Sequence, residues 1–225
     1  MTNQTCILST KTLSADHRQA FIDANIDLLE QDFIEIENID FDLNNINENL
    51  IFTSQNAVFS LVEKHNFDSL KTKKVFCVGI KTKQLLEQNG FEVAVYMDYA
   101  SELAEIIKLI YNQESYTFFS GNLRKDTLPL ALKNAKIKFN EIEVYQTKLS
   151  PCKISDLEKF DGIMFFSPSA VESYLKDNKI KIETCFCIGE TTSEYLESKK
   201  IKNIVIAENP SVDDVVAEVL EYYNR

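Results

Sequence analysis

The sequence has little of what marks several classes of protein. Only two of its 225 residues are histidines, His17 and His65. Both are expected on helix surfaces, and a histidine-based metal site is not expected. No apolar stretch approaches the roughly 18 residues that a membrane helix needs. The first residues, Met1 to Thr10, are too polar and too short for a secretory signal. We therefore expect a cytoplasmic protein with no membrane partner.

Charge and cysteine content exclude further classes. The net charge is −11, whereas nucleic-acid binders gain affinity by neutralising phosphates, so no nucleic-acid partner is expected. A small anionic ligand stays compatible with this charge, because a few amides and cations can bind one. The five cysteines are odd in number and show neither zinc-knuckle nor CxxC spacing. We predict buried, reduced thiols, with Cys185 and Cys187 pointing to opposite faces of one strand.

Motifs of common enzyme mechanisms are also missing. The sequence contains no GxxxxGK[ST] or GxGxxG loop for phosphates or dinucleotides, and no GxSxG nucleophile elbow. Neither histidine stands near a plausible serine nucleophile. An enzyme with this sequence would work without a metal, a nucleotide or a catalytic triad, so no cofactor is expected.

What the sequence does contain is a regular alternation of short strands and helices. This alternation is typical of α/β units around parallel sheets. Strands are expected at 5–9, 26–29, 33–39, 49–53, 74–78, 92–96, 116–119, 139–146, 162–166, 184–188 and 203–206. Helices are expected from the cap Ser14 to Ala24 and at 56–65, 82–88, 101–111, 127–133, 170–176, 192–198 and 212–223.

The chain also contains an internal repeat. Residues 52–58, FTSQNAV, resemble residues 165–171, FFSPSAV, at an offset of 113 positions. Residues 77–82, CVGIKT, resemble residues 187–192, CIGETT, at an offset of 110 positions. Two matches in the same order and at nearly the same offset imply two similar α/β halves.

The repeat leaves out the N-terminal strand and helix, which would then complete the sheet of the C-terminal half. We predict two similar parallel-sheet α/β domains joined by a two-stranded linker. The first domain is formed by residues 1–33 plus 148–225 and the second by residues 40–142, with linker strands at 34–39 and 143–147.

Polar residues and glycines follow the strands of both halves. Ligands of open α/β sheets bind beyond the carboxyl ends of strands, where helix N-termini present free amides. Gly79, Gly121 and Gly189 lie at such junctions, where glycine permits a tight turn or the close approach of a ligand. Each polar residue taken alone is an ordinary helix cap. Their recurrence in both halves favours a set of anion-binding loops.

The order of these motifs resembles the uroporphyrinogen-III synthase family over nearly the whole chain. Each signature is weak alone, but their joint order and spacing are specific. They are FTSxNAV at 52–58, VGxKTxxxLxxxGF at 78–91, a Gly turn with an arginine at 121–124, VYxT at 144–147, FxS…AV at 165–171, IGxTTxxxL at 188–196, and Pro-Ser at 210–211. Two departures are Thr10-Lys11, where the family commonly has Thr-Arg, and Ser120-Gly121, where it often has Arg-Gly.

The resemblance implies a fold, a reaction and partners. The family has two α/β domains joined by a pair of strands, with the active-site cleft between them. It converts hydroxymethylbilane, a linear tetrapyrrole bearing many carboxylates, to uroporphyrinogen III with inversion of ring D and loss of water. The resemblance further implies a monomer that needs no cofactor and is compatible with transient hand-over of the substrate from porphobilinogen deaminase.

The resemblance also assigns roles to residues. Tyr145, in VYxT, is suited to hydrogen-bonding the departing hydroxyl, or it is a linker-strand tyrosine packed for structure. Thr191 and Thr192 are the next catalytic candidates, or they are caps of the following helix. Arg124 and Lys81 add charge at the rim of the cleft or lie on solvated helix faces. The predicted substrate-binding residues are Thr10, Lys11, Thr53, Ser54, Asn56, Gly79, Thr82, Ser120, Gly121, Asn122, Ser167, Ser169 and Gly189.

Two other functions compete with this interpretation. A non-catalytic small-anion-binding module of the periplasmic-binding type also has two α/β lobes and a hinge, but the lack of a signal sequence weighs against it. A sugar-phosphate or nucleotide enzyme of doubly wound fold is disfavoured by the missing phosphate and dinucleotide motifs.

Overall fold

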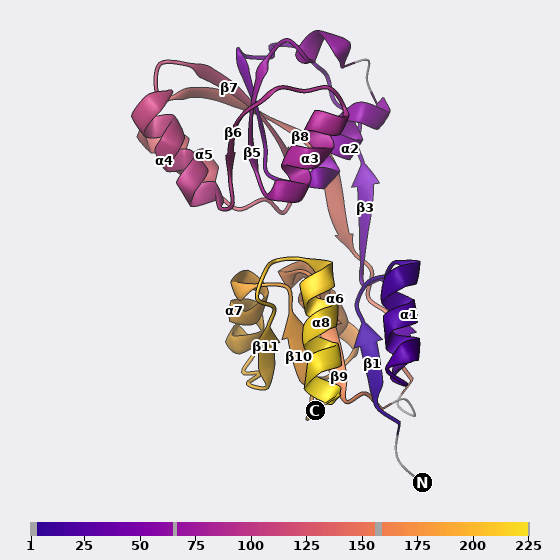
Figure 1. Ribbon diagram of the computed structural model, residues 1–225. Coiled ribbons are helices and arrows are strands. Elements are labelled where there is room, and N and C mark those ends of the chain that lie inside the picture. The colour runs from indigo at the N-terminus through magenta and orange to yellow at the C-terminus, as the bar shows by residue number, and fades with distance from the viewer. Residues whose placement is uncertain (1–3, 65–66, 156–158, 225) are drawn as a thin grey trace. The chain divides into compact units, whose positions relative to one another are not determined.

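The computed structural model describes residues 4–64, 67–155 and 159–224 and divides into two α/β units (Figure 1). Unit 1 comprises Met1–Glu35 and Lys148–Arg225, and unit 2 comprises Ile36–Thr147. One sheet has five strands and the other has six. The predicted fold class, two parallel-sheet α/β domains, is confirmed. His65 lies outside the described residues.

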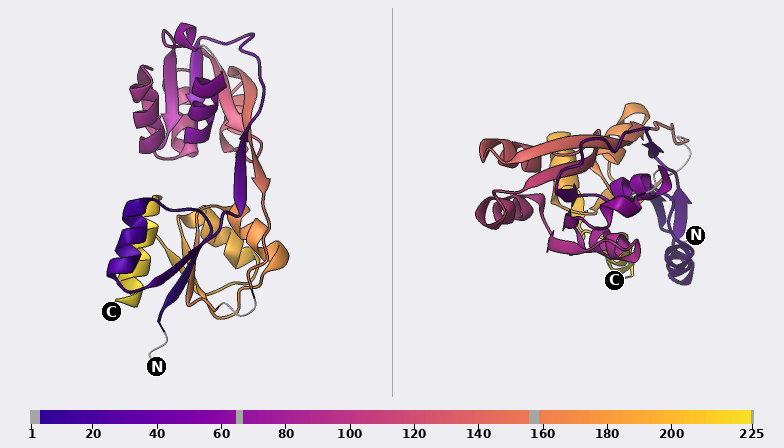
Figure 2. Two further views of the ribbon diagram at one scale, coloured as in Figure 1. Left: turned by 90° about the vertical axis from the view of Figure 1, so that its right-hand side faces the viewer. Right: turned by 90° about the horizontal axis from the view of Figure 1, so that it is seen from above.

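The sheet of unit 1 has the strand order β11-β10-β9-β1-β2, and its neighbouring strands are parallel. Helices α6 and α7 cover one face, and α1 and α8 cover the other, where Figure 2 shows them side by side. The elements are β1 Cys6–Ser9, α1 Ala15–Asp23, β2 Asp27–Glu30, β9 Gly162–Phe165, α6 Pro168–Asp177, β10 Thr184–Cys187, α7 Glu190–Ser198, β11 Ile204–Ile206 and α8 Val212–Tyr223.

The six-stranded sheet has the order β3-β8-β7-β4-β5-β6. Helices α2 and α3 pack on one face, and α4 and α5 pack on the other. The elements are β3 Ile34–Asn38, β4 Asn49–Phe52, α2 Gln55–Lys64, the 3-10 helix η1 Asp68–Leu70, β5 Lys74–Val78, α3 Ile80–Gln88, β6 Val93–Met97, α4 Ala100–Ile110, β7 Ser115–Gly121, α5 Thr127–Asn134 and β8 Lys138–Leu149.

Local sequence explains why these elements form. In β4, Leu50 and Phe52 enter the core under α2 and α3, whereas Ile51 enters the core under α4 and α5. Such a strand is apolar throughout because helices cover both faces of its sheet. The predicted cap Ser14 accepts a hydrogen bond from the N–H of His17 in the first turn of α1. No helix in the described part of the chain is long and apolar enough to span a membrane.

The two sheets repeat the same arrangement. The segment β4-α2-β5-α3-β6-α4 occupies the positions that β9-α6-β10-α7-β11-α8 occupies in unit 1. Strand β1 lies beside β9 as β7 lies beside β4, so β1-α1-β2 is the counterpart of β7-α5-β8. The N-terminal segment therefore completes the sheet built by the C-terminal strands.

One expectation about the cysteines was wrong. Cys185 and Cys187 both lie in the core under α6 and α7, so their thiols share a face of β10. Residues two apart on a strand point to the same side, because side chains alternate with a period of two. Both thiols are free and fully buried, and burial raises the pKa of each to about 12.

Candidate functional site

Each sheet has one point at which its strand order reverses. In unit 1 the chain runs from β1 to β2 in one direction and from β9 through β10 to β11 in the other. In unit 2 the corresponding reversal lies between β7 and β4. Open parallel sheets bind ligands outside the carboxyl ends of strands at such a point. Most of the predicted residues lie at or just after the ends of these four strands. Those from Gly79 to Thr82 and from Gly189 to Thr192 follow β5 and β10, next to β4 and β9, and Tyr145 lies on β8, next to β7.

At the reversal of unit 1, Thr10 and Lys11 follow β1. Thr10 is buried, and its hydroxyl donates to the carbonyl of Met164 at 2.8 Å, which ties β1 to β9. This hydroxyl is therefore used in a hydrogen bond between two strands of the sheet. Lys11 is exposed, and its Nζ lies 5.8 Å from the ring centroid of Phe166. Lys11 is thus the member of this pair that offers a charge to a ligand.

Two serines follow β9 on the other side of this reversal. Ser167 caps α6, because its Oγ accepts a hydrogen bond from the N–H of Ala170 at 3.1 Å. The Oγ of Ser169 lies 2.9 Å from the Oγ of Ser167. The pair lies where the first amides of α6 favour a negative charge.

At the reversal of unit 2, Thr53 and Ser54 link β4 to α2. Ser54 Oγ accepts a hydrogen bond from the N–H of Asn56 at 3.1 Å, so Ser54 caps this helix. Thr53 is half-buried, and its hydroxyl makes no hydrogen bond to any described residue. This group can therefore bind a ligand without losing an internal bond.

The end of β7 lies against β8. Ser120 is buried and donates to Glu141 Oε1 at 2.6 Å. A Cβ at Gly121 would lie 2.3 Å from Cζ of Tyr145, so the tyrosine ring covers this glycine. The Asn122 side chain bonds to the main chain of Thr147. The hydroxyl of Tyr145, a half-buried residue, makes no hydrogen bond within the described ranges.

The two glycine turns of the repeat differ in conformation. Gly79 precedes α3 with a φ of 88°, a left-handed conformation that favours glycine. Gly189 precedes α7 with a φ of 170°, which is extended backbone, and a Cβ there would lie 3.9 Å from Pro210 Cβ. Of the two roles expected for a glycine at these junctions, the tight turn is not needed at Gly189, whose backbone is extended, and the close approach of a ligand stays a prediction.

The helices after these glycines begin two residues earlier than predicted. Helix α7 starts at Glu190 with Gly189 as its cap, so Thr191 and Thr192 lie in its first turn. Thr82 has the equivalent place in α3. A glycine cap has no side chain for a capping bond, so the sequence pattern mistook the first hydroxyls for caps. Thr82 and Thr192 are both buried, whereas Thr191 is half-buried.

The basic residues near these strand ends are not equivalent. Arg124 is held by Glu141, with its Nε 2.6 Å from Oε1 and its Nη2 2.9 Å from Oε2, and it also contacts Asp126. Burial raises the pKa of Glu141, but hydrogen bonds from Arg124 and Ser120 outweigh it and hold that pKa below the ordinary value. The charge of Arg124 is thus compensated within the protein. Lys81, in the first turn of α3, is exposed.

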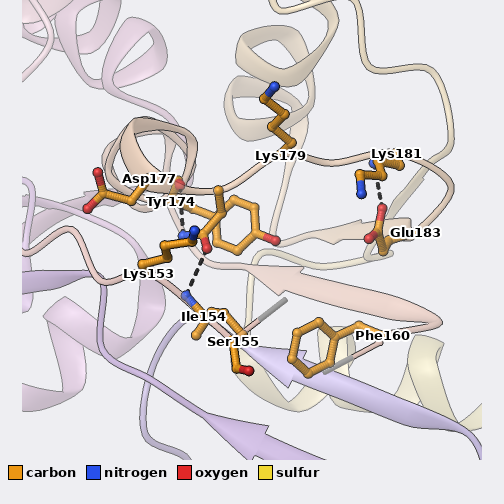
Figure 3. Close-up of a pocket in the computed structure, with 10 residues that line it drawn as sticks. Lys153, Ile154, Ser155, Phe160, Tyr174, Asp177, Lys179, Lys181 and Glu183 are labelled. Atoms are coloured by element: carbon orange, nitrogen blue, oxygen red, sulfur yellow. Dashed lines mark hydrogen bonds between the residues drawn. The ribbon is translucent and has the colours of Figure 1, made fainter. Parts of the chain in front are cut away.

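A cavity of about 480 Å³ lies elsewhere, at the amino ends of the strands of unit 1 (Figure 3). Phe160 precedes β9 and Glu183 precedes β10, and Tyr174 reaches the cavity from α6. None of the predicted site residues lines it. Among the described residues, no group of three or more His, Cys, Asp and Glu side chains is placed to hold a metal ion.

Comparison with known sequences decides the family. A family model described as uroporphyrinogen-III synthase HemD matches residues 18–217. The chain belongs to the uroporphyrinogen-III synthase family. It is 25% identical over 233 aligned residues to the uroporphyrinogen-III synthase of Saccharomyces cerevisiae, covering 87% of this chain and 83% of the relative. It is 26% identical over 201 residues to that of Chlorobaculum parvum, covering 76% and 79%.

Solved structures share the fold. The uroporphyrinogen-III synthetase of Helicobacter pylori 26695 matches with a TM-score of 0.74 at 23% identity, over 97% of this chain and all of that one. A mutant uroporphyrinogen III synthase of Thermus thermophilus matches with a TM-score of 0.69 at 13% identity, over 98% of both chains. These matches agree with the two-sheet architecture of the family.

Sequence reasoning missed two residues that make contacts along β8, on the approach to Tyr145. Ser60, fully buried on α2, donates to the carbonyl of Val144, next to Tyr145. The carboxylate of Glu141 accepts hydrogen bonds from Ser120 and Arg124. The internal repeat could have pointed to Ser60, because Ser173 lies 113 positions after it, the same offset that relates residues 52–58 to residues 165–171. No signal in the sequence marked Glu141, whose partners depend on the register of β7 with β8.

Proposed function

We propose that this chain catalyses the uroporphyrinogen-III synthase reaction, which closes hydroxymethylbilane to uroporphyrinogen III with inversion of ring D and loss of water. Membership of the family over residues 18–217 carries the proposal. The grouping of hydroxyls and helix N-termini at both sheet reversals supports it, because a substrate with many carboxylates needs several separate anion-binding loops.

We propose that the carboxylates bind to groups that the fold leaves accessible. These are the hydroxyl of Thr53, the pair Ser167 and Ser169, and the first-turn amides that follow Gly79 and Gly189. Lys11 and Lys81 supply exposed positive charge near two of these loops. Such local groups can bind an anion even though the chain as a whole carries a net charge of −11.

We propose that Tyr145 assists the first chemical step. The bond from the terminal methylene carbon to its hydroxyl breaks, and the electron pair leaves with the oxygen. A phenol is a weak acid near neutral pH, so Tyr145 would donate a hydrogen bond to the departing hydroxide. The cation that remains is attacked by the substituted carbon of ring D, and the spirocyclic product fragments and closes again as the type III ring. The proton that ring D loses on this closure combines with the hydroxide to give the water that is released.

Positioning is the other half of the proposed mechanism. Without guidance the same cation closes directly to the type I isomer. The enzyme must therefore stabilise the spirocyclic route more than direct closure, by holding the chain folded and by aiming dipoles at the developing charges. Hydroxyls and amides in fixed positions are suited to this task, and strong acids or bases are not required.

A coupled assay tests the proposal. Porphobilinogen and porphobilinogen deaminase are incubated with and without this protein, and the oxidised products are separated as uroporphyrin I and III. We expect a shift from type I to type III. Type I alone, from protein shown to be folded by circular dichroism, would reject the synthase activity and favour a two-lobed anion-binding module.

We also propose that the chain works as a monomer and receives its substrate from the deaminase by transient contact. Size-exclusion chromatography with light scattering tests the first point. For the second, an inactive variant of this protein is added as a competitor to the coupled assay. If it lowers the yield of type III isomer without binding free substrate, hand-over is supported, and an unchanged yield argues against it.

A further inference from the structure

A β-bulge lies beside Tyr145 in unit 2. Strand β7 pairs with β8 in a regular register up to Ser120 and Glu143, but the next pair is Gly121 with Tyr145. Val144 is therefore an extra residue on β8. Bulges bend a strand and re-aim a side chain, and they are common next to active sites. Here the bulge places the ring of Tyr145 opposite a glycine.

The carbonyl of the extra residue, Val144, accepts hydrogen bonds from two donors. The hydroxyl of Ser60, on α2, donates to the oxygen of Val144. The main-chain N–H of Ile39, just after β3, donates to the same oxygen at 3.3 Å. Val144 and Ser60 are both fully buried. A buried carbonyl without partners would be costly, so these two bonds hold the bulge in place.

Asn122 holds the other side of Tyr145. Its Oδ1 accepts a hydrogen bond from the N–H of Thr147 at 2.8 Å, and its Nδ2 donates to the carbonyl of Thr147 at 3.3 Å. Its own N–H donates to the carbonyl of Tyr145 at 3.4 Å. The Oδ1 and one of the two amide N–H groups of the side chain are thus bonded to the main chain of β8. These bonds fix the Asn122 side chain beside the strand.

We propose that Asn122 is a positioning residue, which acts with Ser60 and Gly121 to fix the hydroxyl of Tyr145 and does not bind the substrate itself. Asn122 bonds the main chain on both sides of Gln146, Ser60 holds the bulge before Tyr145, and Gly121 leaves room for the ring. The proposal rests on the proposed function, and it replaces the sequence-based role of Asn122 as a substrate ligand.

A double-mutant cycle tests this role in the coupled assay. Asn122→Ala is made in the wild-type chain and in Tyr145→Phe, and kcat, KM and the ratio of type III to type I isomer are measured. We expect Asn122→Ala to lower kcat about tenfold in the wild-type chain, since small misplacement of a reacting group is costly. In the Tyr145→Phe chain it should lower kcat less than about twofold, because the hydroxyl that it positions is gone.

Asn122→Asp separates positioning from binding. The carboxylate can still accept the hydrogen bond from Thr147, so KM should stay within about twofold of the wild-type value. A group facing an anionic substrate would behave differently, because the new negative charge would raise KM more than Asn122→Ala does. Asn112→Ala is the matched control, since Asn112 is exposed and its Nδ2 donates to the carbonyl of Lys108 at 3.0 Å, on α4. This control should leave kcat and KM unchanged.

Each result has a defined meaning once thermal unfolding shows that the variants are folded. An equal loss of kcat in both backgrounds, a raised KM for Asn122→Asp, or an unaffected Tyr145→Phe enzyme would overturn the positioning role. These outcomes all require wild-type protein that forms the type III isomer. Wild-type protein that forms none rejects the proposed function, and the positioning role falls with it.

Discussion

The aromatic ring of Tyr145 occupies the space that a side chain on Gly121 would need. A Cβ on Gly121 would be 2.3 Å from Cζ, 2.5 Å from Cε2 and 2.8 Å from Cε1 of the tyrosine. Real Cβ atoms essentially never come this close to another heavy atom. This glycine therefore provides space for the proposed catalytic ring, which explains its position at the end of β7 without a positive φ.

Gly121→Ala should displace that ring. We expect a loss of about 1–3 kcal/mol in the free energy of unfolding from overpacking, together with a fall in turnover. Urea unfolding and the coupled assay measure the two effects. Tyr145→Ala in the same chain removes the obstacle, so Gly121→Ala should cost much less stability in that background. If Gly121→Ala costs the same stability with and without the tyrosine, the clash between the new Cβ and the Tyr145 ring is not the cause of the loss.

Ser60 and Ser173 occupy equivalent positions of the repeat but differ in their partners. Ser60 donates to the Val144 carbonyl, whereas the hydroxyl of Ser173 is buried and makes no hydrogen bond among the described residues. Ser60→Ala should lower the free energy of unfolding by about 0.5–1.5 kcal/mol, because it removes one of the two hydrogen bonds to the buried Val144 carbonyl. Ser173→Ala should be neutral or stabilising, because no hydrogen bond to Ser173 Oγ is lost. Thermal melts of both variants measure this. If Ser173→Ala lowers the free energy of unfolding more than Ser60→Ala does, the expected difference between the two serines is wrong.

The two glycine turns give a second matched pair. Gly79→Ala places a side chain on a backbone with a φ of 88° and should cost about 1–2 kcal/mol. Gly189→Ala should leave stability within about 0.5 kcal/mol, because its backbone is extended and there is room for a Cβ. Chemical denaturation distinguishes the two. If Gly189→Ala nevertheless loses activity, close approach of a ligand to that loop is supported.

Sequence patterns predicted the elements well where local signals are strong. Strand β5 and helix α8 have the predicted bounds, Lys74–Val78 and Val212–Tyr223. The starts of α3 and α7 were placed too late, because glycine caps carry no side-chain signal. The equivalence of β1-α1-β2 with β7-α5-β8 rests on sheet order, so no sequence match between those segments could reveal it.

The candidate site was less predictable than the fold. Strand ends rich in Ser, Thr and Gly could be located, but the direction of each hydroxyl depends on register and packing. Thr10 turns inward to Met164, and Ser120 turns to Glu141. The bulge at Val144 has no signature in the sequence, since it arises from the pairing of two strands. The neighbours of Tyr145 could therefore not be foreseen.

The pair of Glu141 and Arg124 should make stability depend on pH. In the folded state the pKa of Glu141 is held below its ordinary value of 4.5. The ionised carboxylate therefore contributes to the free energy of unfolding fully above pH 4.5, and this contribution is lost as the pH falls through the lower pKa of the folded state. Glu141→Gln should therefore be less stable than wild type near neutral pH and lose less stability on going to about pH 3. Urea unfolding across this range measures the difference.

The control for this experiment is Glu105→Gln. Glu105 pairs with Lys108 on α4, and its side chain is 60% exposed. Exposed pairs of this kind contribute little to stability, so the acid dependence of this variant should match that of wild type. If the stability of Glu141→Gln also falls with pH as that of wild type does, the pair of Glu141 and Arg124 does not cause the loss of stability in acid.

The order in which the sheets are completed has a consequence for protein synthesis. Unit 2 is a continuous segment of chain, whereas Ile7 of β1 must wait to pair with Gly162 of β9. On the ribosome, unit 2 can fold as soon as it emerges, because domains fold as units and the N-terminal one usually does so first. Strand β1 is made before unit 2, but its sheet is completed only after unit 2. In the nascent chain, Ile7 and Leu8 therefore have no β9 partner until the whole middle of the protein has been made.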